Sequence, residues 1–216
     1  MMQTFAMDAF WARYGKIDFD STAFAKALDR LPDISENGPW IGGGSVRRLI
    51  AGLPQDSDFD FFFADQAQFD AFCKDMKKRG AEVQHENDFN ITFLLPKAKA
   101  KPIGDDEFTV AGPELKVQAI RLRFHPTLAE TLEGFDFSLC KFGYDGTSLV
   151  CGDYSLFDLA SKRLVPDRIS FGTSTLRRII KYTKQGYTIC SGGLAKILQQ
   201  VVDDPTIIQA EVEDVD

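Results

Sequence analysis

The sequence lacks the features that would indicate a membrane protein, a secreted protein or a zinc-binding motif. No stretch approaches the roughly 20 uninterrupted apolar residues that a membrane helix needs. Residues 1–16 contain neither the basic start nor the long apolar block of a secretory signal. The four cysteines, Cys73, Cys140, Cys151 and Cys190, form no CxxC pair. They therefore favour buried thiols in a reduced, cytoplasmic protein.

An excess of positive charge is missing as well. The formal net charge of −7 argues against a protein that coats nucleic acid along its whole surface. The charge is uneven: seven basic residues and the single acid Asp167 fall between Lys162 and Lys184, whereas the stretch from Asp203 to Asp216 holds six acids and no base. The basic strip can still meet phosphates, and the tail indicates a solvated acidic end.

The chain does contain enough apolar material for one sizeable core, since 44% of its 216 residues are hydrophobic and 19 are Phe. Its patterns predict helices near residues 4–14, 21–31, 45–51, 66–79, 126–133, 154–161, 173–186 and 193–202. They predict strands near residues 39–42, 57–63, 81–86, 89–95, 106–110, 114–122, 135–144 and 147–151. We therefore expect an α+β fold, with a mixed β-sheet flanked by helices and a small helical segment at the C-terminal side.

A glycine-rich turn that includes Gly43 and Gly44 separates a predicted strand from a predicted helix. Glycines there permit positive φ angles and let a ligand approach the backbone closely. The helix that begins at Ser45 presents free N–H groups and the positive end of its dipole to that ligand, which makes a ready site for phosphate. Arg47 and Arg48 add positive charge one turn along. A glycine-rich turn by itself, however, is more often only a turn.

Two acids, Asp58 and Asp60, follow at strand spacing. The period of two places both carboxylates on one face, about 6.5 to 7 Å apart along the chain, and directs Phe59, Phe61 and Phe63 toward a core. Carboxylates on one surface, opposite a phosphate-binding turn, can hold one or two Mg²⁺ or Mn²⁺ ions that bridge phosphates and activate an attacking hydroxyl. An exposed Asp-x-Asp alone is more often solvated surface. Here, however, the glycine turn supplies a place for phosphates and the acids supply ligands for the metal ions that bridge them.

The combination resembles the signature of the polymerase-beta-type nucleotidyltransferase superfamily, which consists of a Gly-Gly or Gly-Ser turn, a short helix and Asp-x-Asp. It is most similar to the head of the CCA-adding and poly(A) polymerase group, whose pattern is Gly-Gly-x-Val-Arg-Asp-x-x-x-Gly. The positions in register are Gly43, Gly44, Val46, Arg47 and Gly52, and Arg48 stands where that group has Asp. The resemblance implies a nucleotidyltransferase head over residues 1–152 and a helical neck with an acidic tail over residues 153–216.

Residues 158–189 carry the resemblance to the neck. The matching positions are Leu176, Arg177, Gly186 and Tyr187, and the group's nucleotide-reading Glu-Asp pair falls on Thr173 and Ser174. By this resemblance, Arg177 or Lys181 turns toward the triphosphate or the base. The residues themselves also allow a solvated basic face, because Leu176, Ile179, Ile180 and Thr183 form an apolar stripe at helical spacing.

The superfamily normally places a third acid on a neighbouring strand, and two positions compete for this role here. The best strand match by order is the segment 115–122, but its central residue is Gln118, which cannot bind metal with charge. The other candidate is Asp136, at the mouth of the predicted strand 135–144, with Phe135 and Phe137 pointing inward. Asp136 then acts as a third metal ligand or base, or else it caps the strand or pairs with a cation.

The function that the resemblance implies is metal-dependent transfer of a nucleotidyl group from an NTP, ATP among the candidates, to a hydroxyl acceptor. The acceptor is an RNA end, another nucleotide or a protein side chain. In this interpretation Asp58, Asp60 and Asp136 bind Mg²⁺ or Mn²⁺, and the phosphates lie on Gly43, Gly44, Ser45, Arg47, Arg48, Arg177 and Lys181. The alternative is a catalytically degenerate module of the same fold that binds a nucleotide or a partner. A narrower possibility is a minimal transferase that acts as a toxin or phage-defence factor.

Overall fold

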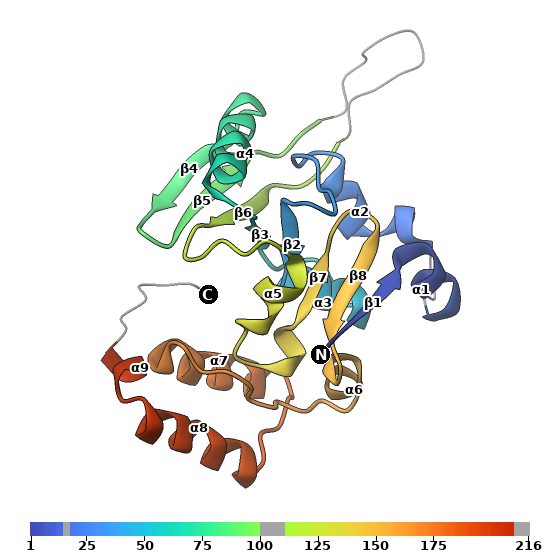
Figure 1. Cartoon of the computed structure of the whole chain (residues 1–216). Coiled ribbons are helices and arrows are strands. Elements are labelled where there is room, and N and C mark those ends of the chain that lie inside the picture. Colours follow the sequence, from blue (N-terminus) through green and yellow to red (C-terminus); the bar gives the residue numbers. More distant parts are fainter. Residues whose placement is uncertain (15–17, 100–110, 210–216) are drawn as a thin grey trace, which may run out of the picture.

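The computed structural model describes residues 1–14, 18–99 and 111–209, which form a mixed sheet with helices packed around it (Figure 1). The strands are Met2–Ala6 (β1), Trp40–Gly42 (β2), Phe59–Phe62 (β3), Glu82–Glu86 (β4), Asn90–Leu95 (β5), Leu115–Ile120 (β6), Phe142–Tyr144 (β7) and Ser148–Gly152 (β8). They make one eight-stranded sheet in the order β1-β8-β7-β2-β3-β6-β5-β4. β3 and β6 are parallel, whereas the other paired neighbours are antiparallel.

Helices cover the sheet and continue beyond it. They are Met7–Tyr14 (α1), Ala23–Leu28 (α2), Gly44–Ala51 (α3), Gln66–Lys78 (α4), Leu128–Glu133 (α5), Ser155–Ala160 (α6), Gly172–Lys184 (α7), Ser191–Asp203 (α8) and Thr206–Gln209 (α9), with 3₁₀ turns at Phe19–Ser21 (η1) and Ser138–Cys140 (η2). Figure 1 shows α7, α8 and α9 together at the end of the molecule opposite α4. The predicted α+β class is confirmed. Within the described ranges, no helix is both long enough and apolar enough to cross a membrane.

The central strand β3 separates the aromatic core from the face that carries the acids. Phe59, Phe61 and Phe63 are almost completely buried, as their alternation predicts. On this side the Phe61 and Phe72 rings lie 4.5 Å apart, so that α4 packs directly on the strand. The other face of β3 carries Asp60 and also Phe62, which packs against Phe135 at 5.5 Å. The aromatic face therefore anchors the strand while its alternate positions remain available for polar side chains.

Two predicted elements are wrong in detail. The predicted helix from residue 4 begins only at Met7, because residues Met2–Ala6 form β1 and pair with β8 at the edge of the sheet. The predicted strand 135–144 is reduced to β7, and its first half becomes a loop and η2. This half leaves the sheet because its backbone pairs with the loop around Pro166 instead: Ser138 N donates to Val165 O at 3.0 Å and Asp167 N donates to Asp136 O at 2.7 Å. The predicted strand 106–110 and the acidic segment 210–216 lie outside the described residues.

Helix α7 buries only part of the predicted apolar stripe: Ile179 packs against the core, together with Tyr182. Leu176 and Ile180 are 55% and 56% exposed. Ser174 and Thr175 are buried instead. The physical reason lies beneath the helix, where the acidic side chain of Asp136 is buried and needs hydrogen-bond donors.

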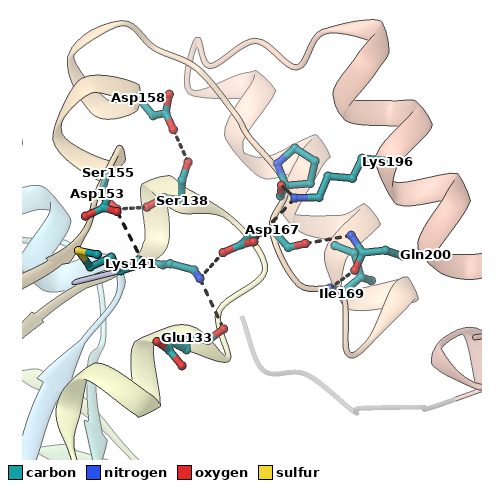
Figure 2. Close-up of polar contacts among 12 residues, drawn as sticks. Glu133, Ser138, Lys141, Asp153, Ser155, Asp158, Asp167, Ile169, Lys196 and Gln200 are labelled. Carbon is teal, nitrogen blue, oxygen red and sulfur yellow. Dashed lines mark hydrogen bonds and ion pairs between the residues drawn. The ribbon is translucent and has the colours of Figure 1, made fainter. Parts of the chain in front are cut away.

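A polar network fastens the C-terminal helices to the sheet (Figure 2). The buried ammonium group of Lys141, next to β7, forms an ion pair with Asp167. Burial alone would raise the pKa of the Asp167 carboxyl. The hydrogen bonds and charges of Lys141 and Lys196 outweigh burial, and they lower this pKa below its ordinary value. From α8, Gln200 donates to Asp167 O at 2.9 Å and accepts from Ile169 N at 2.8 Å. The network links β7, the 166–169 loop and α8.

Candidate functional site

The glycine turn brings the backbone of the β2–α3 connection next to an acid. Gly43 has φ +77°, a conformation that favours glycine, and a Cβ added there would lie 3.6 Å from Asp60 Oδ2. At Gly44 an added Cβ would lie 2.4 Å from Ser57 Oγ, so a side chain there would require the Ser57 hydroxyl to move. Gly43 is also the N-cap of α3 and offers no side-chain cap, so the first N–H groups of this helix lack an intrahelical acceptor.

Sheet register places the acids between the glycine turn and β6. Asp60 on β3 pairs with Gly42 on β2 on one side and with Gln118 on β6 on the other. Gln118 therefore lies on the strand directly beside the acidic pair. Its Nε2 donates to Asp58 Oδ2 at 3.0 Å, so the side chain reaches the site as an amide donor.

The two acids have contrasting surroundings. Asp58 Oδ2 accepts from Gln118 and also lies 2.9 Å from Lys116 Nζ. Asp60 Oδ1 is buried and has no hydrogen-bond partner in the described part of the chain. Burial, followed by the charge of Asp58, raises the pKa of Asp60 to about 7, although the charges of Lys181, Arg178 and Lys116 act in the opposite direction. An unsatisfied buried carboxylate of this kind is a strong acceptor for a cation or a proton.

Asp136 lies in the loop before η2, rather than at the mouth of a strand, and is bound to α7. Its Oδ2 accepts from Thr175 Oγ1 at 3.0 Å and from Arg178 Nη1 at 2.8 Å. Among the described residues, no group of three His, Cys, Asp or Glu side chains converges as a metal site. The structure thus brings Asp58 and Asp60 together, and it places Asp136 in an ion pair with Arg178.

Both arginines of the motif make contacts within the protein. Arg47 is buried, and its guanidinium lies 4.7 Å from the Tyr182 ring centre and 5.7 Å from that of Tyr187. Its Nε and Nη1 have no hydrogen-bond partner among the described residues. Arg48 Nε donates to Pro54 O at 2.6 Å, and its guanidinium forms an ion pair with the exposed Asp56. Ser45 Oγ is buried and, within the described ranges, has no partner either.

On α7, Thr173, Arg177 and Lys181 are spaced four residues apart and lie on one exposed face, whereas Ser174 is buried. Burial and the charge of Asp58 raise the pKa of Asp60, and the positive charge of Lys181 acts against them. Sequence reasoning missed Lys116, although it stands two positions before Gln118 and therefore on the same face of β6.

The family model that matches this chain is described as Gad2, a Gabija anti-defense 2 family protein, and the match covers residues 8–162. The chain belongs to the Gad2 family. No curated protein matches this Gad2 family member. The acidic pair, the glycine turn and Gln118 all lie inside the matched part.

Solved structures with a similar fold include CCA-adding enzymes. The Thermotoga maritima enzyme complexed with tRNA is 17% identical, with a TM-score of 0.56 over 94% of the Gad2 chain and 47% of its own. A CCA-adding enzyme with ATP is 18% identical and has a TM-score of 0.56, covering 94% of the Gad2 chain and 46% of its own length. A CCA-adding enzyme with CTP is 17% identical and has a TM-score of 0.55, covering 97% of the Gad2 chain and 49% of its own length. The Gad2 chain therefore has a polymerase-beta-like nucleotidyltransferase fold and spans about half the length of these enzymes.

Proposed function

We propose that this chain is a metal-dependent nucleotidyltransferase that moves a nucleotidyl group from an NTP to a hydroxyl acceptor. The observation that carries the proposal is the close approach of the Gly43 backbone to Asp60, whose Oδ1 is buried without a partner among the described residues. In this proposal the turn that would receive the phosphates and the carboxylate that would hold the cation lie within one contact distance. In this proposal residues 1–152 are the catalytic head and residues 153–216 are the neck.

The donor set fits a hard divalent cation such as Mg²⁺ or Mn²⁺. Asp58 and Asp60 present carboxylate oxygens, the ligand type that these ions prefer. When bound, such a cation neutralises charge on the phosphates and helps to activate the attacking hydroxyl. The unsatisfied Oδ1 of Asp60 supports this assignment independently of the resemblance.

Each remaining residue of the site has a role that follows from its position. The backbone at Gly43 and Gly44, with the uncapped N-terminus of α3 and Ser45, receives the phosphates. Lys181 supplies positive charge from the α7 side, and Arg177 extends the same basic strip. Catalysis of this type depends on positioning and charge neutralisation, so few protein groups are needed.

In this proposal Arg47, Arg48 and Asp136 stabilise the structure around the site. Arg47 and Arg48 contribute charge near the phosphates, while their guanidinium groups hold Tyr182 and the loop at Asp56. Asp136 was the sequence candidate for the third ligand or base. Because its Oδ2 is taken by Arg178 and Thr175, we propose that it clamps α7 to the head instead.

The solved relatives suggest what to test as substrates. CCA-adding enzymes have been solved with ATP, with CTP and with tRNA. We propose an NTP as donor for this chain, with an RNA end, a nucleotide or a protein hydroxyl as acceptor. The family description adds a biological context, and we propose that the activity counteracts Gabija defence.

A specific observation favours a second candidate function, a nucleotide-binding module without transferase activity. Gln118 replaces the expected third acid, and Lys116 neutralises Asp58. Such a module would still bind a nucleotide at the glycine turn, but it would transfer nothing.

Incubation of the protein with each labelled NTP, together with RNA and protein pools, tests both candidates. The enzyme predicts labelled product that requires Mg²⁺ or Mn²⁺ and disappears in Asp58→Asn with Asp60→Asn. The matched control is Asp88→Asn, which removes an exposed carboxylate away from the site. Nucleotide binding without product supports the binding module. Absence of both nucleotide binding and product contradicts the proposed function.

A further inference from the structure

The strand β6 carries two donors that reach Asp58. Lys116 and Gln118 are two residues apart and share one face of the strand. Lys116 Nζ lies 2.9 Å and Gln118 Nε2 lies 3.0 Å from the same oxygen, Asp58 Oδ2. The position beside the acidic pair that would carry a third negative charge therefore carries a neutral amide, and an ammonium group stands next to it.

The two carboxylates of the site consequently differ in what they can still bind. Asp58 is 23% exposed and already has a cation and an amide on Oδ2. Asp60 has a buried oxygen with no partner among the described residues. A divalent ion at Asp58 Oδ2 would have to displace Lys116 or lie against its positive charge, and both are unfavourable. Among the described residues, no cation or amide binds Asp60 Oδ1 in this way.

We infer that Lys116 and Gln118 replace one of the two divalent cations that a paired-carboxylate site can hold. The inference rests on the proposed function, because it concerns nucleotide binding at the same acids. The site then binds an NTP with one divalent ion, held at Asp60 and by the phosphates. Lys116 supplies the second positive charge as a fixed part of the protein, and it acts as a positioning residue through Asp58.

Counting bound Mn²⁺ tests this stoichiometry without relying on turnover. The full chain is titrated with Mn²⁺ in the presence of a non-hydrolysable ATP analogue, and free Mn²⁺ is measured by electron paramagnetic resonance. Binding of the labelled analogue is measured in the same samples. We expect one Mn²⁺ per chain in the ternary complex of the wild type. We expect two in the variant Lys116→Ala with Gln118→Asp, which restores a third acid and removes the competing charge.

A milder variant keeps the test decisive if the buried Gln118→Asp change impairs folding. Lys116→Met alters only a half-exposed side chain, and we expect a second Mn²⁺ to bind at least about fivefold more tightly, the effect of removing one screened charge. Lys74→Met, on the exposed face of α4, is the matched control and should leave both Mn²⁺ count and affinity unchanged.

The outcomes separate this inference from the proposed function. Two Mn²⁺ ions in the wild-type complex, or a second Mn²⁺ affinity that Lys116→Met does not change, overturns the inference while nucleotide binding stands. If no variant binds the analogue, with or without Mn²⁺, the proposed function fails and the inference fails with it.

Discussion

The ion pair between Asp136 and Arg178 yields the sharpest prediction about stability. Arg178→Met removes the cation from an Asp136 carboxylate that is only 8% exposed. Breaking a buried pair by deleting one partner costs about 3–5 kcal/mol, because the other charge stays buried without compensation. Thr175 still donates to Asp136 at 3.0 Å. We therefore expect a loss near the lower end, about 3 kcal/mol.

Removing the carboxylate instead of the cation should lower the free energy of unfolding by a smaller amount. In Asp136→Asn the remaining Arg178 is 27% exposed and can reach water, so we expect a loss of about 1–2 kcal/mol. The double variant should be more stable than the sum of the two losses predicts, with a coupling free energy of about 1–3 kcal/mol. This coupling isolates the pair from the packing that each side chain also provides.

Urea unfolding followed by circular dichroism measures these free energies. For a chain of this size, 3 kcal/mol corresponds to a fall in Tm of about 6–12 °C. Arg168→Met, an exposed position in the loop before α7, serves as the control and should stay within about 0.5 kcal/mol of the wild type. A loss below 1 kcal/mol in Arg178→Met, or fully additive single variants, would refute the clamp.

Three further predictions concern the site and its supports. Asp60→Asn should raise the free energy of unfolding above pH 7 in the absence of divalent metal. An ordinary Asp loses its proton near pH 3.8, whereas folded Asp60 keeps it to about pH 7. The wild type therefore loses stability as the pH rises from 3.8 to 7, and the Asn variant does not. The shift corresponds to about 4 kcal/mol. Because the Asp60 side chain is only partly buried although its Oδ1 is fully buried, we reduce the expected effect on the free energy of unfolding to about 2 kcal/mol. Urea midpoints between pH 4 and 8 measure this effect, and identical pH profiles of the two proteins contradict it. Asp167→Asn should lower the free energy of unfolding by about 3 kcal/mol, because it leaves the buried Lys141 without its ion-pair partner. Lys141→Met should lower it by only about 1–2 kcal/mol, because the remaining Asp167 is half-exposed. Urea unfolding measures both losses, and the opposite order contradicts this prediction. Gly44→Ala should lower stability by about 1–3 kcal/mol through its clash with Ser57 Oγ, and Ser57→Gly should restore most of the Tm; no rescue would place the strain elsewhere.

The sequence predicts the central motif well because its parts are local. The glycine turn, α3 and β3 occupy 23 consecutive positions, residues 41–63, and strand alternation alone separates Asp60 from Phe59 and Phe61. Their burial follows the predicted pattern. The nucleotidyltransferase fold was recognisable from this stretch, and the similarity to solved CCA-adding enzymes confirms it.

Contacts between distant segments could not be predicted in the same way. Lys116 reaches Asp58 because β6 pairs with β3, and neither spacing nor composition reveals that register. The ion pair of Asp136 with Arg178 joins residues 42 positions apart. The apolar stripe on α7 predicts only part of the buried face, because the buried carboxylate of Asp136 binds Thr175 and Arg178 on the same helix. The strand β1 likewise forms only because the edge of β8 is available.

The most direct test of the central claim is Mn²⁺-dependent NTP binding by isothermal titration calorimetry. The wild type should bind a non-hydrolysable ATP analogue with Mn²⁺ and lose at least about tenfold in affinity without it. Asp60→Asn should abolish the Mn²⁺ effect, whereas Asp136→Asn should leave it intact. Equal binding by wild type and Asp60→Asn, with and without Mn²⁺, would contradict a metal and phosphate site at the acidic pair.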